Sequence, residues 1–323
     1  MRNSRIQDIS FYLPSRQLEN CDLERLFPGM RASQIEKKLG ITVRRIAGEN
    51  ETATDLAVAA AVQLLERHDR SQIDYVIFCT QSPDYKLPAS ACLIQERLGL
   101  GTHAGAVDIN QGCSGYIYGL SLAQGLIASE AANQVLLLTG ETYSKYLHPE
   151  DRGNRAIFGD GASATLLTAS EEEGVGRFVF GTDGKGWDQL VLMNGGSRHP
   201  QAPEDDQQSW LFMNGPEIFN FTIRMVPLLC KETLVRNHLE TGEIKAVLFH
   251  QANAFMLNHL KNICSIPDEK FIIDMQGTGN TVSSSIPIVL SKRLSDGSFV
   301  QGDKILLAGF GVGYSWAGVV ITV

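Results

Sequence analysis

Short apolar runs alternate along the chain with longer stretches in which apolar residues recur at helical spacing. The apolar runs are typical of buried strands in sheets that are covered on both faces, and they lie at 75–79, 135–138, 164–167, 246–249 and 305–308. The apolar spacing predicts helices over 54–65 and 219–234, and we expect Pro227 to kink the second helix or mark its start. This alternation predicts an α/β protein with largely buried sheets.

Cys113 stands at the point where one apolar run gives way to a helical pattern. The segment 106–120 contains a strand-like stretch, a small polar turn and a stretch rich in small residues, and Cys113 closes the turn. A helix N-terminus presents unpaired N–H groups and the positive end of a dipole, which favour a thiolate. We therefore expect a lowered pKa for Cys113 and a nucleophilic role. The alternative is that Cys113 is a small buried apolar residue, as most free cysteines are.

Two polar residues far downstream complete a pattern of nucleophilic catalysis. His250 ends the apolar run 246–249, and Asn280 lies at the tip of a glycine- and serine-rich loop over 276–287. Taken singly, His250 is typical of a hydrogen-bonded core histidine and Asn280 of a turn residue. A single cysteine that meets a distant His and Asn in the fold is the general arrangement of a cysteine nucleophile.

The glycine-rich segment 309–313 follows a predicted strand. Its spacing is weak support for a dinucleotide site, because no helical pattern follows and residues 314–323 alternate like another strand. We expect these glycines to let the backbone approach the sulfur of Cys113.

Nine short motifs, in order along essentially the whole chain, resemble the beta-ketoacyl-acyl-carrier-protein synthase III family of thiolase-like enzymes. They are Tyr12–Pro14, Leu39–Ile41 with Arg45–Ala47, Leu87–Cys92, the Cys113 segment, Asp151–Gly153, Phe158–Ala162, His250–Asn253, Gly279–Thr281 and Gly309–Gly313.

The resemblance implies a five-layered αβαβα fold made of two similar halves with the active site between them. The segments 74–83 and 245–253 both read as a strand that ends in a polar turn, and this weak similarity agrees with two related halves. The charged, glycine-ended stretch 170–174 is the expected boundary, which gives an N-terminal half over 1–170 carrying the cysteine and a C-terminal half over 171–323 carrying His and Asn. The polar loop 194–208 either flanks the substrate entrance or is merely solvated.

The resemblance also implies a reaction and the residues that perform it. Cys113, His250 and Asn280 correspond to the catalytic triad, and the backbone N–H groups of Cys113 and Val312 to the oxyanion hole. The cysteine would take an acyl group from a thioester, and a malonyl thioester would then lose carbon dioxide and condense with it to a 3-oxoacyl product. The further substrate- or carrier-binding residues would be Arg152, Asn253, Leu87 and Phe310, with no metal and no cofactor beyond the thioester substrates.

The chain departs from the family where the carrier binds. Gln34 replaces a tryptophan that flanks the adenine of coenzyme A, while Arg152 beside the adenine is retained. Phe255 stands where the family often has an arginine, and Asn220 and Asn262 stand where it has lysines. Pro216 stands where it has the asparagine of the tunnel. We expect acyl carrier protein, acyl-coenzyme A or both as partners, with Lys37, Lys38, Arg44 and Arg45 as a substitute basic patch.

Composition narrows the class further. The 323 residues are 43% hydrophobic and carry a net charge of −8, which argues against a nucleic-acid surface. The N-terminal residues lack the apolar core of a signal peptide, and no apolar run is long enough to span a membrane. The six cysteines form no CxxC pair, which indicates reduced thiols, and we expect a cytoplasmic protein.

Two other functions stay open beside condensation. One is transfer of the acyl group from Cys113 to an amine or hydroxyl of a small molecule or sugar. The other is a non-catalytic partner subunit, which the presence of Cys113 disfavours. The resemblance further implies a homodimer in which the strand over 104–109 pairs across a two-fold axis and Leu87 of one subunit closes the acyl pocket of the other.

Overall fold

The computed structural model of the chain describes residues 2–200 and 209–323. Its strands are β1 (Asn3–Tyr12), β2 (Arg16–Glu19), β3 (Val43–Ile46), β4 (Tyr75–Cys79), β5 (Gly105–Ile109), β6 (Gln134–Glu141), β7 (Gly161–Ser170), β8 (Val179–Thr182), β9 (Leu190–Val191), β10 (Phe212–Met213), β11 (Ala246–Phe249), β12 (Lys304–Gly311) and β13 (Ser315–Thr322). Its α-helices are α1 (Asn20–Leu26), α2 (Ala32–Leu39), α3 (Ala53–Leu65), α4 (Ser90–Arg97), α5 (Gly115–Ala128), α6 (Arg152–Arg155), α7 (Gly215–Arg236), α8 (Ala254–Ile263) and α9 (Ser285–Ser295).

The strands form two main sheets, and each sheet takes its strands from one side of residue 170. The larger sheet has the order β1-β7-β6-β4-β5, in which β4 runs parallel to both β5 and β6. The smaller sheet has the order β11-β12-β13-β8, in which β11 runs parallel to β12. The central strands β4, β6 and β12 are almost wholly buried, which explains why they are continuous apolar runs in the sequence.

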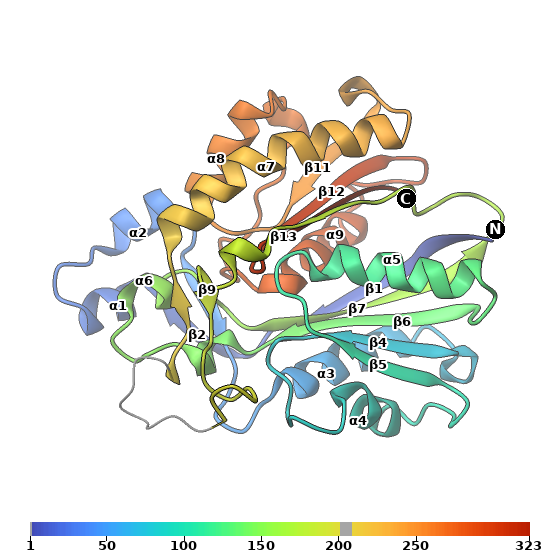
Figure 1. Cartoon of the computed structure of the whole chain (residues 1–323), viewed down its shortest axis with the longest axis horizontal. Coiled ribbons are helices and arrows are strands. Elements are labelled where there is room, and N and C mark those ends of the chain that lie inside the picture. Colours follow the sequence, from blue (N-terminus) through green and yellow to red (C-terminus); the bar gives the residue numbers. More distant parts are fainter. Residues whose placement is uncertain (1, 201–208) are drawn as a thin grey trace.

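Helices cover both faces of both sheets (Figure 1). The α5 and α9 helices lie between the sheets, and their apolar residues share one core with both, as Ile117, Leu137, Val289 and Leu307 illustrate. Helices α3 and α4 cover the outer face of the larger sheet, and α7 and α8 cover the outer face of the smaller sheet. The layers therefore run helix, sheet, helix, sheet, helix, which confirms the predicted α/β fold class with five layers.

Sequence patterns located the main elements and missed details at their ends. The expected strand 135–138 extends over all of β6, and the expected helix 219–234 lies inside the longer α7. Pro227 lies within α7 and does not mark its start, because Asn214 caps that helix and Pro216 occupies its first turn. The part of the predicted polar loop over 201–208 lies outside the described residues.

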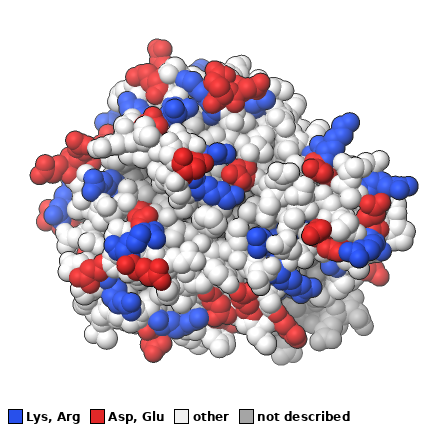
Figure 2. Space-filling view, turned by 180° about the vertical axis from the view of Figure 1, so that it is seen from behind, with Lys and Arg blue, Asp and Glu red and all other residues white. Residues whose placement is uncertain are grey.

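Charge is distributed without a continuous basic surface on the face shown in Figure 2, where Lys and Arg side chains alternate with Asp and Glu. This mixture agrees with the acidic net charge of −8. Among the described residues, no helix combines the length and apolar character needed to cross a membrane.

Candidate active site

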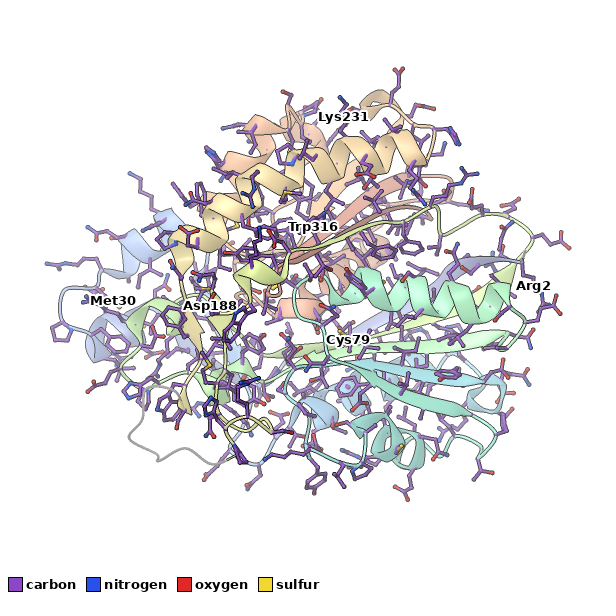
Figure 3. The ribbon with its side chains drawn as sticks, in the orientation of Figure 1. Arg2, Met30, Cys79, Asp188, Lys231 and Trp316 are labelled. Carbon is purple, nitrogen blue, oxygen red and sulfur yellow. The ribbon has the colours of Figure 1, made fainter. Side chains whose placement is uncertain are left out.

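Cys113 lies in the turn between β5 and the start of α5, as the sequence predicted, and only 6% of its surface is exposed. The helix begins at Gly115, where a Cβ atom would lie 2.3 Å from the sulfur of Cys79. Cys79 is labelled in Figure 3 and ends the neighbouring strand β4. A glycine at the first helical position therefore lets the nucleophile's turn sit directly on the sheet.

The end of β12 approaches Cys113 closely. A Cβ atom on Gly311 would lie 2.9 Å from the Cys113 sulfur, and one on Gly309 would lie 2.7 Å from the Cys113 carbonyl oxygen. Both distances are too short for a side chain, so the glycines bring backbone to the sulfur as expected. The backbone N–H groups of Cys113 and Val312 hydrogen-bond to this sulfur and favour its thiolate form.

The expected lowering of the Cys113 pKa is wrong. Burial, with a smaller contribution from the Glu141 carboxylate, raises the pKa of Cys113 to about 12 from an ordinary value of 9.0. The two backbone N–H groups act in the opposite direction but do not outweigh the loss of water around the sulfur. Cys113 is therefore a thiol at neutral pH in the free protein.

His250 follows β11 directly and is 2% exposed. Its Nδ1 lies 2.8 Å from Oγ of Ser285, which also accepts a hydrogen bond from the Gln251 N–H at 3.2 Å. The Ser285 hydroxyl can donate to Nδ1, and in that tautomer the imidazole proton lies on Nε2. Burial lowers the pKa of His250 to about 3, so the ring is neutral at physiological pH.

Asn280 is held by the backbone of the loop that carries it. Its backbone N–H donates to the Ile157 carbonyl at 2.9 Å, and its side-chain Oδ1 accepts from the Val282 N–H at 2.9 Å. Because the carbonyl of the side chain is used in this way, the amide NH₂ is the end left to serve as a donor.

The three residues meet in one cavity of about 110 Å³. The walls are mainly apolar and include Phe158, Leu190 and Met213, and the other predicted substrate residues Asn253 and Phe310 line it as well. The Phe310 ring meets the His250 ring edge-on with centroids 6.0 Å apart. Asn253 also caps α8, because its Oδ1 accepts from the Met256 N–H at 2.9 Å.

The two remaining predicted residues lie outside this cavity. Arg152 lines a separate depression of about 420 Å³, together with Arg31, Gln34 and Lys38. Ile157 lines both that depression and the catalytic cavity, so the two adjoin. Leu87 is 81% exposed and lines neither of them.

The predicted basic patch is partly wrong. Arg44 is fully buried, and its Nε and Nη2 donate to the Ala156 carbonyl while Nη1 donates to Asn20. Arg45 is half-buried and donates to the Pro14 carbonyl at 2.9 Å. Lys37 and Lys38 are exposed on α2. Arg31 and Arg152 line the same depression as Lys38 and add positive charge there.

Sequence reasoning missed Glu141 and Ser285 as parts of the site. Glu141 ends β6, is fully buried, and accepts hydrogen bonds from the Gln81 N–H at 3.0 and 3.1 Å and from Ser82 Oγ at 2.8 Å. Burial raises the pKa of Glu141 to about 8. Glu141 could have been found because it is a carboxylate at the end of an apolar strand. Ser285 could not, because it stands in a run of serines and nothing in the sequence distinguishes it.

The described residues contain no cluster of His, Cys, Asp and Glu able to hold a metal ion, and all six cysteines are free thiols. Asn220, Phe255 and Asn262 differ from the family where the carrier is expected to bind, and they are exposed on α7 and α8. The Phe255 ring packs at a tilt against Phe219, with ring centroids 5.7 Å apart, and none of the three positions carries a charge.

Comparison with known proteins gives one consistent answer. Models of the 3-oxoacyl-[acyl-carrier-protein] synthase III family match residues 107–184, and models of its C-terminal part match residues 234–323. The chain is 36% identical to a beta-ketoacyl-[acyl-carrier-protein] synthase III of Clostridium perfringens, over 99% of each chain.

Solved structures agree with this result. A crystal structure of a 3-oxoacyl-(acyl-carrier-protein) synthase III superposes with a TM-score of 0.96 at 46% identity, covering 99% of this chain and 100% of the other. The corresponding synthase of Burkholderia xenovorans superposes with a TM-score of 0.94 at 36% identity, covering 100% of this chain and 94% of the other. The chain therefore belongs to the 3-oxoacyl-[acyl-carrier-protein] synthase III family of thiolase-like acyltransferases.

Proposed function

We propose that this acyltransferase carries its acyl group on Cys113 and condenses it with a malonyl thioester to a 3-oxoacyl product. One observation supports the proposal most strongly. The buried sulfur of Cys113 shares a cavity with a neutral His250 and with the amide of Asn280, and two backbone N–H groups point at the sulfur.

In the first step the Cys113 sulfur attacks the carbonyl carbon of an acyl thioester. The bond from that carbon to the carrier sulfur breaks, and the thiol proton of Cys113 leaves with the carrier thiol. The N–H groups of Cys113 and Val312 stabilise the tetrahedral oxyanion, an interaction worth about 3–4 kcal/mol for a single donor of this type.

In the second step a malonyl thioester enters the same cavity. Nε2–H of His250 and the amide of Asn280 donate to its thioester oxygen as the carboxylate leaves as carbon dioxide. The electron pair of the broken bond forms an enolate, which attacks the acyl carbon and expels the Cys113 sulfur as a thiolate that takes a proton from solvent. Neutral N–H donors suit this step, because each can hydrogen-bond to the developing negative charge while it keeps its proton.

The product mixture tests this reaction. Incubation with an acyl thioester and malonyl thioester labelled at its free carboxyl should release labelled carbon dioxide and yield a 3-oxoacyl thioester. Acyl transfer to amines or alcohols without release of carbon dioxide would contradict condensation and support the alternative reaction. The donor orientation of Asn280 favours condensation, since simple acyl transfer needs no enolate stabilisation.

We further propose that acyl carrier protein delivers the malonyl group across the depression beside α2. Arg31, Lys38 and Arg152 supply positive charge there, suited to the phosphate of a pantetheine arm, and the depression adjoins the catalytic cavity at Ile157. Rates with malonyl carrier protein should exceed those with malonyl-coenzyme A and fall as salt rises. A salt-insensitive preference for the coenzyme A form would contradict this assignment.

The proposed assembly is a homodimer formed through β5. This strand lies at the edge of the larger sheet, and unpaired edges are association sites. Val107 on β5 is 37% exposed and Leu87 is 81% exposed, so both side chains are available to a partner subunit. We propose that Leu87 closes the acyl pocket of the partner. Light scattering should give twice the 35.4 kDa mass of one chain, and a monomer at micromolar concentration would contradict the dimer.

We propose a cytoplasmic location. Cys21 and Cys92 are exposed free thiols, which persist in a reducing compartment. Alkylation of these cysteines in intact cells before lysis checks their redox state.

A further inference from the structure

Two cysteines outside the catalytic cavity meet where helices α7 and α8 pack on each other. Cys230 lies on α7, directly before Lys231, which is labelled in Figure 3, and Cys264 is the C-cap residue of α8. Both cysteines belong to the apolar cluster that these two helices form over the smaller sheet. Two helices that are distant along the chain therefore bring the two thiols together.

The two thiols are hydrogen-bonded to each other, and their surroundings differ. Cys230 is 8% exposed, whereas Cys264 is half-buried, so solvent reaches the pair on the side of Cys264. The hydrogen bond from Cys230 lowers the pKa of Cys264, and the same bond together with burial raises the pKa of Cys230 well above its ordinary value. Cys264 is therefore the thiolate of the pair, and Cys230 keeps its proton.

The cysteine of the catalytic cavity is not activated in this way. Burial raises the pKa of Cys113 to about 12, and it also raises the pKa of Cys79. On the surface, a hydrogen bond with Glu19 raises the pKa of Cys21. Since the thiolate is the form that oxidants attack, Cys264 should react before these three residues.

We propose that Cys230 and Cys264 are a redox-sensitive pair, which hydrogen peroxide converts to a disulfide that ties α7 to α8. The Cys264 thiolate attacks one oxygen of the peroxide, the O–O bond breaks, and hydroxide leaves and takes a proton from solvent. The resulting sulfenic acid on Cys264 is then attacked by the Cys230 sulfur. The S–O bond breaks, and the hydroxyl leaves as water with the proton of Cys230. Two thiols are oxidised and one peroxide is reduced to two molecules of water.

The position of the pair allows this bond to form and leaves the catalytic cysteine free. A disulfide requires the sulfurs to approach to about 2.05 Å, and Cys264 can adjust because α8 ends there. Neither cysteine lines the catalytic cavity, although α7 and α8 contribute Thr222 and Met256 to its walls. Disulfides that form reversibly in a reducing compartment are typically redox-sensing, which suits two free thiols held in contact.

The test treats the reduced full-length protein with a small excess of hydrogen peroxide. Remaining thiols are then alkylated under denaturing conditions, and the peptides are mapped by mass spectrometry. The peptides that contain Cys230 and Cys264 should be joined with the loss of two hydrogen atoms, and dithiothreitol should separate them again. This link should form at least about tenfold faster than any oxidation of Cys113.

Three variants separate the roles of the two thiols. Cys230→Ala should leave a sulfenic acid on Cys264 that dimedone traps, because no second thiol resolves it. Cys264→Ala should give neither the link nor a trapped adduct on Cys230. Cys92→Ala is the matched control, because it removes an exposed thiol outside the pair and should still form the link.

The inference fails if Cys113 is oxidised ahead of the pair, or if Cys21 or Cys92 is oxidised while Cys230 and Cys264 stay unlinked. It also fails if Cys230 in Cys264→Ala gains a dimedone adduct as fast as Cys264 does in Cys230→Ala, which would contradict the order of attack. None of these measurements depends on the reaction proposed for Cys113, so the proposed function stands or falls separately.

Discussion

Oγ of Ser285 lies 2.8 Å from Nδ1 of His250 while it accepts a hydrogen bond from the backbone of Gln251. In the tautomer in which Ser285 donates to Nδ1, Nε2–H is left as a donor. We predict that Ser285→Ala slows condensation on the order of five- to tenfold, the effect of losing a hydrogen bond of about 1 kcal/mol. Rates of carbon dioxide release and of Cys113 acylation, measured separately, check this. Ser285→Thr keeps the hydroxyl and should restore condensation, whereas an equal loss in both steps would indicate a merely structural role.

His250→Ala and Asn280→Ala should impair condensation far more than acylation. In the tautomer in which Ser285 donates to Nδ1, Nε2 of His250 carries a proton and therefore cannot accept the proton of the Cys113 thiol. The same Nε2–H and the Asn280 amide stabilise the enolate, and loss of such a donor costs about 10²–10³ in rate. Both variants should gain the acyl mass and release little carbon dioxide. Condensation at the wild-type rate in either variant would show that its residue has been given the wrong role.

Gly311→Ala should block acylation without unfolding the protein. The added Cβ would lie 2.9 Å from the Cys113 sulfur, so it would occupy the space that the acyl carbon needs. Gly125→Ala on α5 is the matched control, because nothing lies within 4 Å of its added Cβ. We expect Gly311→Ala to lose Cys113 acylation and the control to retain it, with Gly311→Ala unfolding at a lower temperature because its Cβ overpacks Cys113. An active Gly311→Ala enzyme would place the acyl group elsewhere.

Glu141 should make the protein less stable as pH rises. Its folded-state pKa is raised from 4.5 to about 8, so its contribution is fully present below 4.5 and is lost as pH rises through 8. Wild type should therefore lose stability relative to Glu141→Gln across this window, by at most about 1.4 kcal/mol per pH unit. Urea unfolding of both proteins at several pH values measures the difference. A difference independent of pH would show that Glu141 is ionised in the folded protein.

The sequence predicted the ends of strands better than the environment of side chains. Cys113 and His250 were recognisable because each follows an apolar run, and such runs are strands whose ends lie at the edge of a sheet. Asn280 was recognisable because a glycine-rich loop needs special backbone conformations, and Gly279 indeed has φ of 73°. Local patterns are enough for these assignments.

The remaining features depend on neighbours that are distant along the chain. The pKa of Cys113 was expected to be lowered by its position at a helix N-terminus. Several other elements bury the residue, and this burial raises the pKa instead. Arg44 was expected on the surface, yet its side chain is buried and donates a hydrogen bond to the Ala156 carbonyl. A cavity of about 650 Å³ is likewise lined by residues from 81 to 312, which no local pattern connects.

The mass of Cys113 after reaction tests the central claim most directly. Intact protein incubated with an accepted acyl thioester should gain one acyl group, located on the peptide that contains Cys113, and should lose it when malonyl thioester is added and a 3-oxoacyl product forms. Cys113→Ala should gain nothing. An adduct that persists in Cys113→Ala, or one that malonyl thioester leaves in place, would contradict the account.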